Sequence, residues 1–317
     1  MPPSCPVTGE PAVRLVQWVS ARHLTALWRL LFRADPRSSF SGTTRFGLWE
    51  SPTGLHFFDP MRAGDADFYA AFYRSRGMRQ YLRDPDRDEF RTAAAYVRPA
   101  DRVLDVGCGF GAFRHHVPHA TYVGLDPHFA GGEDRPWARA ELLSDHLVRH
   151  AGSYDVVCAF QVLEHVTDPV SLMAEMARAA RPGGLVIAGV PHVPSAQTGI
   201  PNWLTNAVPH HLTWWTKPAL VALARRVGLT DAIVRESAWS RGDVFVHWMA
   251  RLSPVRCRAH YYRHAWSWYA AALVGALGGV VAASFLPLPK PGTDEGVALL
   301  LVARRTVDLS TDLQDTP

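Results

Sequence analysis

Short apolar runs alternate with segments of helical periodicity between residues 103 and 304. The runs of strand length are 103–106, 121–126, 154–160, 184–190, 232–237 and 296–304. The segments 169–184 and 217–229 carry apolar residues at helical spacing, and each has proline near its start and glycine near its end. Fully apolar strands that alternate with helices are typical of a parallel sheet covered on both faces. The pattern therefore predicts an α/β domain.

Two parts of the chain depart from this rhythm. Residues 1–90 contain prolines, aromatic residues and charges without regular alternation, and residues 241–292 form an irregular block between the last two predicted strands. We therefore expect an N-terminal cap over 1–90, a core over 91–307 that carries the insertion, and a tail over 308–317.

The composition is that of an ordinary globular protein, since 48% of the 317 residues are hydrophobic and 20% are charged. The formal net charge of +4 is too small to predict nucleic-acid binding. The N-terminus has no apolar stretch of the signal-peptide kind, and the widely separated cysteines are expected to be free thiols in a reducing cytoplasm. We expect a cytoplasmic protein, whose oligomeric state has no signal in the sequence.

A glycine-rich turn follows the first predicted strand of the core. Gly107, Gly109 and Gly111 come directly after this strand, and the strand itself contains Asp105. Glycines allow a tight turn and let a ligand approach bare backbone groups. The run also matches the G-x-G-x-x-G/A pattern of dinucleotide sites, but Asp105 would repel a pyrophosphate and attract a cation. S-adenosylmethionine carries an ammonium and a sulfonium, so it is the favoured ligand over NAD.

A second acid supports an adenosine ligand. Asp126 ends the second predicted strand, 19 residues after Gly107. An acid at this spacing is placed to accept hydrogen bonds from ribose hydroxyls, a feature that NAD sites share. The alternative role for Asp126 is a helix N-cap ahead of Pro127.

Four segments of the chain resemble the class I S-adenosylmethionine-dependent methyltransferases. In chain order they are VLDVGCGFGAF, YVGLDP, SYDVVCAFQVLEHVTDP and RPGGLVIAGVP. The resemblance covers about half of the chain. It implies a Rossmann-like, doubly wound sheet of seven strands whose last strand is antiparallel, with 241–292 inserted between the last two strands.

The resemblance also implies a set of cofactor-binding residues. The acid and the loop after the first strand would surround the methionine portion, Asp126 would hold the ribose, Glu141 or Leu142 would flank the adenine, and Gln161 would line the reactive side. The predicted residues are Asp105, Gly107, Cys108, Gly109, Gly111, Asp126, Glu141, Leu142 and Gln161. No metal is expected.

Histidines are the candidates for a catalytic base. Methyl transfer from a sulfonium mainly requires alignment and exclusion of water, but an oxygen acceptor must also lose a proton. Histidine suits this task near neutral pH. His210 and His211 lie in PHHLTWW, which resembles a family stretch whose histidine often faces the acceptor. We predict His211, His210 and His165 as catalytic residues, with a structural role for His165 as the alternative. Glu164 either bonds His165 or caps the following helix.

The N-terminal segment resembles a zinc ribbon that has lost its metal ligands. CPVTG and WESPTG correspond to the paired knuckles found in some methyltransferases of this class. The four ligand positions hold Cys5, Thr8, Glu50 and Thr53. Zinc requires four thiolate or imidazole ligands, so we expect a ribbon-like fold held by aromatic packing instead. A helical lid over 64–90 would follow.

An uncharged apolar run covers residues 269–286. It is long enough for a marginal membrane-spanning helix, but a single crossing would separate the two strands of the predicted hairpin on either side. Three interpretations are open. A packed helical hairpin broken at Gly278-Gly279 ranks first, followed by a lid over an apolar acceptor and by peripheral membrane contact through 256–289.

The sequence as a whole predicts methyl transfer from S-adenosylmethionine to a small-molecule acceptor or a lipid- or sugar-linked acceptor, on oxygen. Two alternatives stay open. The protein could be a non-catalytic scaffold that binds the cofactor, or an NAD-dependent oxidoreductase.

Overall fold

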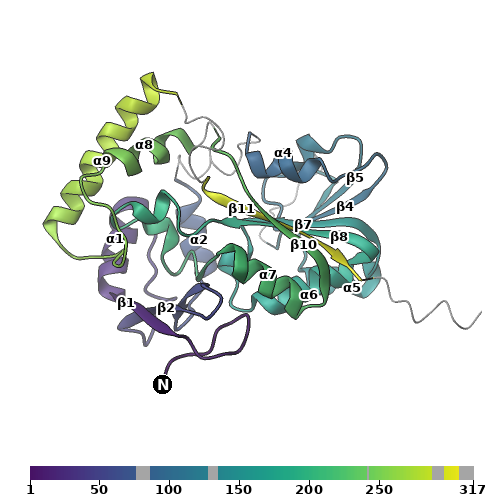
Figure 1. The fold of residues 1–317 in the computed structure, drawn as a ribbon, viewed down its shortest axis with the longest axis horizontal. Helices are drawn as coiled ribbons and strands as arrows, with labels where there is room; N and C mark the ends of the chain where they lie inside the picture. Colours follow the sequence, from purple (N-terminus) through teal and green to yellow (C-terminus); the bar gives the residue numbers. More distant parts are fainter. Residues whose placement is uncertain (76–85, 128–134, 241–242, 288–295, 307–317) are drawn as a thin grey trace, which may run out of the picture.

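A seven-stranded sheet forms the core of the computed structural model, which describes residues 1–75, 86–127, 135–240, 243–287 and 296–306 (Figure 1). The strand order is β10-β11-β8-β7-β4-β5-β6. In chain order the strands are β4 (Arg102–Val106), β5 (Thr121–Leu125), β6 (Ala138–Arg139), β7 (Tyr154–Phe160), β8 (Ala180–Pro191), β10 (Leu229–Glu236) and β11 (Ala298–Arg305).

The pairing of these strands confirms the predicted sheet. The pairs β4–β5, β4–β7, β5–β6 and β7–β8 are parallel, whereas β11 is antiparallel to both β8 and β10. The first six residues of β11 are buried. This burial explains why the strand reads as an unbroken apolar run in the sequence.

Helices cover both faces of the sheet. On one face pack α5 (Leu143–His150), α6 (Pro169–Ala179) and α7 (Lys217–Arg226), and on the other pack α4 (Asp88–Ala94) and the short 3₁₀ turn η1 (Ala112–His116). Helix α6 begins where the sequence predicts. Asp168 caps it by accepting a hydrogen bond from the Ser171 amide, and Pro169 occupies the first turn. The doubly wound arrangement predicted from the alternation is therefore confirmed.

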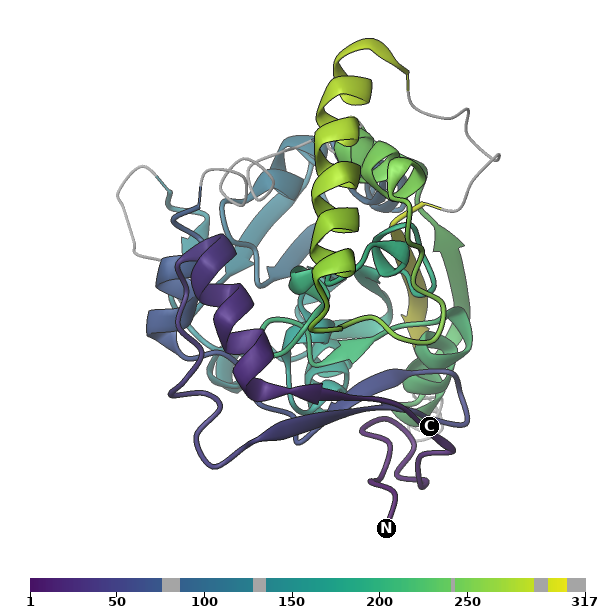
Figure 2. The same ribbon diagram turned by 90° about the vertical axis from the view of Figure 1, so that its left-hand side faces the viewer.

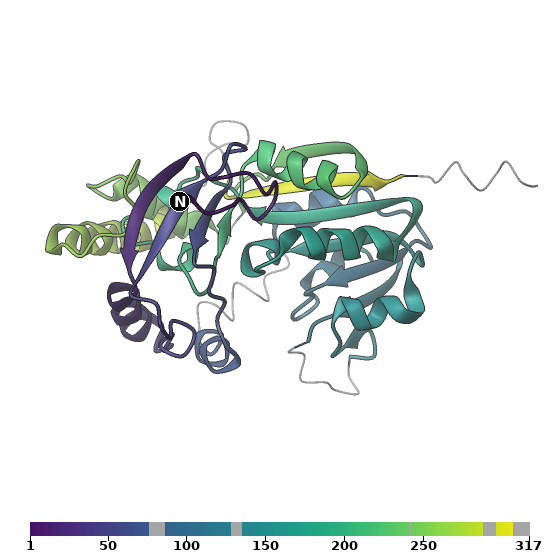
Figure 3. The same ribbon diagram turned by 90° about the horizontal axis from the view of Figure 1, so that it is seen from below.

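The N-terminal residues form a second, four-stranded sheet beside the core (Figure 3). Its order is β1-β2-β3-β9, where the strands are β1 (Arg14–Ser20), β2 (Arg45–Glu50), β3 (His56–Asp59) and β9 (Thr213–Trp214). Helices α1 (Ala21–Phe32) and α2 (Ala66–Phe72) complete this part. The sequence did not predict that a strand after residue 210 would join the N-terminal sheet.

Two hydrogen-bonded turns occupy the segments that resemble zinc knuckles. The Gly9 amide donates to the Cys5 carbonyl at 2.9 Å, and the Gly54 amide donates to the Ser51 carbonyl at 2.9 Å. Both glycines have positive φ, +78° and +77°. The Cys5 side chain packs in the core rather than toward solvent, and all four cysteines of the chain are free.

In the described part of the insertion between β10 and β11 lie two helices, α8 (Val244–Leu252) and α9 (Trp266–Phe285). The predicted break at Gly278-Gly279 is wrong, because α9 continues through both residues. A Cβ atom at Gly279 would lie 3.0 Å from the Met249 amide nitrogen, and one at Gly275 would lie 2.9 Å from the Met249 carbonyl oxygen. The glycines thus allow α8 and α9 to approach closely, and this packing outweighs their low helix propensity.

Candidate functional site

The predicted cofactor residues lie along one edge of the core sheet. Asp105, Asp126 and Glu141 stand at or just beyond the carboxyl ends of the neighbouring strands β4, β5 and β6, and Gln161 follows β7. Ligands of open α/β sheets bind outside these strand ends. The strand order therefore brings together residues that the sequence separates by more than 50 positions.

The glycine loop after β4 has the conformation that its sequence requires. Gly107, Gly109 and Gly111 have φ values of +72°, +50° and +72°. A Cβ atom at Gly107 would lie 2.6 Å from Val162, and one at Gly111 would lie 2.2 Å from Trp137. No atom lies within 4 Å of the Cβ position of Gly109. The loop therefore leaves open space at Gly109, where a ligand can approach.

The loop amides are hydrogen-bonded within the protein, which corrects the expectation of bare backbone groups. Gly107 and Cys108 both donate to the Leu125 carbonyl, at 2.7 and 3.0 Å, and Gly111 donates to the Cys108 carbonyl at 2.8 Å. The Gly109 amide donates to Oδ2 of Asp126 at 3.1 Å. The loop thus offers shape rather than a set of unused donors, and Asp126 fixes it to the end of β5.

Asp105 is buried beneath the loop, with only 3% of the residue exposed. The Tyr122 hydroxyl donates a hydrogen bond of 2.6 Å to its Oδ2. Burial raises the pKa of Asp105 to about 7, against smaller opposing effects from Tyr122, Cys158 and Arg87. The carboxyl group is therefore only partly ionised at neutral pH, so its repulsion of a phosphate is weaker than the sequence suggested. A ligand ammonium would favour the ionised form.

Tyr122 is a partner that the sequence reasoning missed. Val103 pairs with Tyr122 and Asp105 pairs with Gly124 in the parallel register of β4 and β5. Side chains two residues apart point to the same face of a strand, so Tyr122 reaches the same face as Asp105. The sequence signal that could have indicated this contact was the tyrosine within the second predicted strand.

The adenine end of the predicted site contains an exposed apolar side chain. Leu142 is 53% exposed directly before α5. Nδ1 of the buried His146 donates a short hydrogen bond to Oε1 of Glu141, at 2.6 Å. Cys108 is buried, and burial raises the pKa of its thiol. Leu142 is therefore the member of this group best placed to cover a planar ring.

Gln161 adopts a backbone conformation that is uncommon outside glycine, with φ of +58°. Its amide nitrogen donates to the Gly189 carbonyl at 2.8 Å, and its side-chain amide donates to Glu89 at 3.1 Å. Glu89 is buried and forms an ion pair with Arg87. The sequence reasoning missed Arg87 and Glu89, because only the fold brings the start of α4 to the end of β7.

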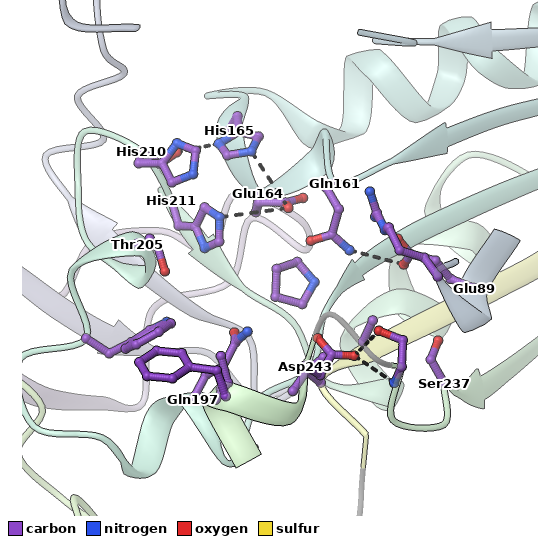
Figure 4. A pocket seen from close by; sticks show the side chains of 18 of the residues that line it. Glu89, Gln161, Glu164, His165, Gln197, Thr205, His210, His211, Ser237 and Asp243 are labelled. Atoms are coloured by element: carbon purple, nitrogen blue, oxygen red, sulfur yellow. Dashed lines mark hydrogen bonds and ion pairs between the residues drawn. The ribbon is translucent and has the colours of Figure 1, made fainter. Parts of the chain in front are cut away.

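A cavity of about 540 Å³ opens beside Gln161 (Figure 4). Its polar wall includes Glu89, Gln161 and Glu164, and its apolar wall includes Phe32, Trp203 and Phe245. Phe245 belongs to α8, whereas none of the described lining residues belongs to α9. The volume is that of a small-molecule site, and the mixture of apolar and polar walls is typical of one.

The three predicted catalytic histidines meet at one end of this cavity (Figure 4). The ring centres of His165 and His210 are 4.4 Å apart, those of His165 and His211 are 4.9 Å apart, and those of His210 and His211 are 4.6 Å apart. Nδ1 of His165 is 2.5 Å from the His210 carbonyl oxygen, so this nitrogen carries the proton. Nε2 of His165 is then the acceptor nitrogen of the neutral ring.

Glu164 lies beside these histidines and is completely buried. Its Oε1 is 3.8 Å from Nε2 of His165 and 3.9 Å from Nε2 of His211, and neither carboxyl oxygen has a hydrogen-bond partner. The helix-cap alternative is wrong, because Asp168 caps α6. Glu164 therefore faces the histidines.

Burial keeps this cluster uncharged near neutral pH. It raises the pKa of Glu164 to about 8 and lowers the pKa of His165 to about 4. It also holds the pKa values of His210 and His211 well below the ordinary value, and the neighbouring histidines add to this effect.

Neutral imidazoles can accept a proton or ligate a metal. The ligand atoms of the three histidines lie within 4.8 Å of one another, so both chemistries are open to the cluster.

Comparison with known proteins identifies the family. The family model described as "Methyltransferase domain" matches residues 73–233, half of the chain. A ubiquinone biosynthesis O-methyltransferase of Rhizobium etli is 32% identical over 155 residues, which are 44% of this chain and 56% of that protein. The protein of the same name from Escherichia coli is 36% identical over 96 residues, which are 26% of this chain and 40% of that protein. The chain thus spans about half the length of the curated relatives that it matches.

Solved structures of methyltransferases are similar to this chain at a lower level. A SAM-dependent methyltransferase from Archaeoglobus fulgidus has a TM-score of 0.44 and 14% identity, and the match covers 75% of this chain and all of that one. A Haemonchus contortus phosphoethanolamine N-methyltransferase in complex with S-adenosylmethionine has a TM-score of 0.40 and 14% identity, with 68% of this chain and 52% of that one covered.

The residues at the strand ends fit S-adenosylmethionine. The buried Asp105 would favour an ammonium, the open space at Gly109 admits a ligand, and the exposed Leu142 offers an apolar surface to a ring. By its family match and its fold, the chain belongs to the methyltransferase domain family.

Proposed function

We propose that this protein methylates a hydroxyl oxygen of a small molecule or of a lipid- or sugar-linked acceptor that has an apolar body. The observation that carries the proposal is the buried, neutral cluster of Glu164 and three histidines at the end of the cavity beside Gln161. An amine acceptor can be delivered as the free base, but a hydroxyl needs a proton acceptor. The names of the curated relatives, which are O-methyltransferases, support an oxygen acceptor.

His211 is the proposed proton acceptor. Bound S-adenosylmethionine supplies an activated methyl group on a positively charged sulfur. His211 takes the proton of the acceptor hydroxyl as the C–O bond forms and the C–S bond breaks. The imidazolium that results lies next to Glu164. Glu164 then releases its own proton to water in the cavity, and its carboxylate balances the new charge. His210 and His165 hold the cluster in place through their ring contacts and the hydrogen bond of His165.

Arg87 is the proposed partner of the cofactor's carboxylate. Arg87 lines the cavity beside Gln161, and its charge acts on both Asp105 and Glu164, which supports this role. In this proposal Asp105 pairs with the ammonium, Asp126 with the ribose hydroxyls, and Leu142 covers the adenine. The loop is shaped by Gly107, Cys108, Gly109 and Gly111. Glu141 holds α5 in position through its hydrogen bond to His146, and Gln161 lines the side that faces the acceptor.

The N-terminal zinc-ribbon likeness also belongs to the proposal. The paired turns at residues 5–9 and 51–54 support descent from a metal-binding ribbon that now packs around Leu55 and Phe57, both buried. The domain bounds and the cytoplasmic location expected from the sequence stay predictions.

A radiolabel assay tests the function. The purified chain is incubated with S-adenosylmethionine labelled in the methyl group and with small-molecule and lipid fractions of a cell extract. We expect label in an ether linkage in one fraction, and we expect His211→Asn to abolish labelling while the affinity for S-adenosylhomocysteine, measured by calorimetry, is unchanged. Label on nitrogen would overturn the oxygen acceptor. Cofactor binding without any transfer would favour the scaffold, and binding of NAD in place of S-adenosylmethionine would favour the oxidoreductase.

A further inference from the structure

The helix α9 exposes a long apolar face. Only 28% of its most apolar window is buried, although the helix is long enough and apolar enough to cross a membrane. We use the name "α9 face" for its large exposed side chains. They are Trp266, Leu273, Val274, Leu277, Val280, Val281 and Phe285, each more than half exposed.

The two sides of α9 are chemically different. The buried positions Trp268, Ala271, Gly275, Gly279 and Ala282 recur every three to four residues and lie on the side that packs against α8. The α9 face lies on the opposite side, because Leu273, Leu277 and Val281 also recur at helical spacing. The contact between α9 and α8 is thus made mainly by small residues, whereas the bulky apolar residues of α9 point outward. A helix of 20 residues extends this face over about 30 Å.

The sequence segment that contains the α9 face carries positive charges and no acidic residue. Residues 244–293 contain no aspartate or glutamate, although the chain has 29 of them. The connection before α9 carries Arg256, Arg258 and Arg263, all exposed. A surface of this composition is complementary to anionic lipid headgroups, and Trp266 at its edge is a residue type favoured at membrane interfaces.

The position of α9 in the fold rules out a single crossing of a bilayer. The strands β10 and β11 on either side of the insertion pair with each other in one sheet. The N-terminal end of α9 contacts α1 through a hydrogen bond of 3.2 Å between the Tyr269 hydroxyl and Nδ1 of His23. Both α1 and α9 face the viewer in Figure 2, and α1 also exposes Leu30 and Leu31. The helix is therefore placed to lie along a surface.

We propose that the α9 face docks on an anionic lipid bilayer, with the helix parallel to the membrane and the three arginines against the headgroups. A second copy of the chain fits less well, since it would present the same positive charges and no complementary acid in this segment. Leu31 of α1 also lines the cavity, so the docked protein would hold the cavity close to the lipid surface.

Vesicle sedimentation tests the docking. The purified full chain is mixed with vesicles of phosphatidylcholine alone or with roughly 30% phosphatidylglycerol, and the bound fraction is measured. We expect strong binding to the anionic vesicles only. The variant Leu273→Ser/Leu277→Ser/Val281→Ser should bind at least tenfold more weakly. The variant Arg256→Gln/Arg258→Gln/Arg263→Gln should lose the preference for anionic vesicles.

A matched control has three exposed apolar residues replaced elsewhere. Val13, Val148 and Ile233 are 63%, 84% and 50% exposed, and their joint replacement by serine should leave vesicle binding unchanged. Affinity for S-adenosylhomocysteine serves as the check that each variant is folded, and it is separate from methyl transfer. The proposal fails if the wild type binds neither vesicle, if the α9 variant binds as well as the wild type, or if light scattering shows a dimer that the α9 variant dissociates.

Discussion

Glu164→Gln is the substitution that reports most directly on the histidine cluster. It replaces the buried carboxyl group by an amide of nearly the same size, so packing is kept and only ionisation is removed. In the folded protein burial raises the pKa of Glu164 to about 8, whereas the ordinary value is 4.5. Between these pH values the folded state holds a proton that the unfolded state has lost.

The sign of the effect follows from this difference in bound protons. Because the unfolded state binds fewer protons between pH 4.5 and 8, the free energy of unfolding of the wild type should fall as the pH rises through this window. Each pKa unit corresponds to about 1.4 kcal/mol, so the penalty reaches roughly 3–5 kcal/mol at pH values above 8. The free energy of unfolding of Glu164→Gln should lack this decrease, because glutamine does not ionise.

Urea unfolding from pH 5 to pH 9 measures the effect. We expect the variant to match the wild type near pH 5 and to exceed it by several kcal/mol near pH 9. Glu10→Gln is the control, since Glu10 is exposed. Its free energy of unfolding should differ from that of the wild type by the same amount at every pH. Methyl transfer by Glu164→Gln should fall at least tenfold. If the stability difference between the wild type and Glu164→Gln is the same at every pH, Glu164 is ionised throughout and the neutral cluster does not exist.

Three other outcomes test the site. Asp105→Asn should weaken S-adenosylhomocysteine binding by tenfold or more, roughly 1.5–3 kcal/mol for a lost charged hydrogen bond. Calorimetry should also show wild-type affinity falling as the pH drops below about 7, because protonation removes the charge that pairs with the ammonium, and a flat profile for the variant. Gly111→Ala should lower the melting temperature and abolish cofactor binding, since its Cβ would lie 2.2 Å from Trp137 at a φ of +72°; Gly199→Ala, with no atom within 4 Å, should have little effect. Prolonged treatment with EDTA should leave methyl transfer unchanged, whereas loss of activity that zinc restores would make the histidines metal ligands.

The core sheet was predictable because its strands are buried on both faces. Runs such as 154–160 need no alternation, and the helices between them carry clear start signals such as Asp168 and Pro169. The N-terminal sheet was not predictable in the same way. Its last strand has only two residues, Thr213–Trp214, and pairs with β3 more than 150 positions earlier in the chain.

The glycine loop and the histidines were visible as local motifs, but the residues that contact them were not. Tyr122 contacts Asp105 through the register of two strands, and Arg87 and Glu89 reach the site from the start of a helix. The raised pKa of Glu164 depends on complete burial, which no local pattern reports. The glycines of α9 were misinterpreted as a break, because the packing partner that makes them favourable lies on another helix.

The short strand β9 connects the N-terminal sheet to the segment that carries the proposed catalytic histidines. The Phe58 amide donates to the Leu212 carbonyl at 2.9 Å, and Phe57 pairs with Thr213. Leu212 and Thr213 are the two residues that follow His211. The glycine loop and Asp126 follow strands β4 and β5 of the other sheet. In the proposed mechanism, cofactor binding and proton removal therefore lie on different sheets. A fragment lacking the first 60 residues would lose the strand pairing next to His211, together with the Cys5, Leu55 and Phe57 side chains that pack into the core of the larger sheet.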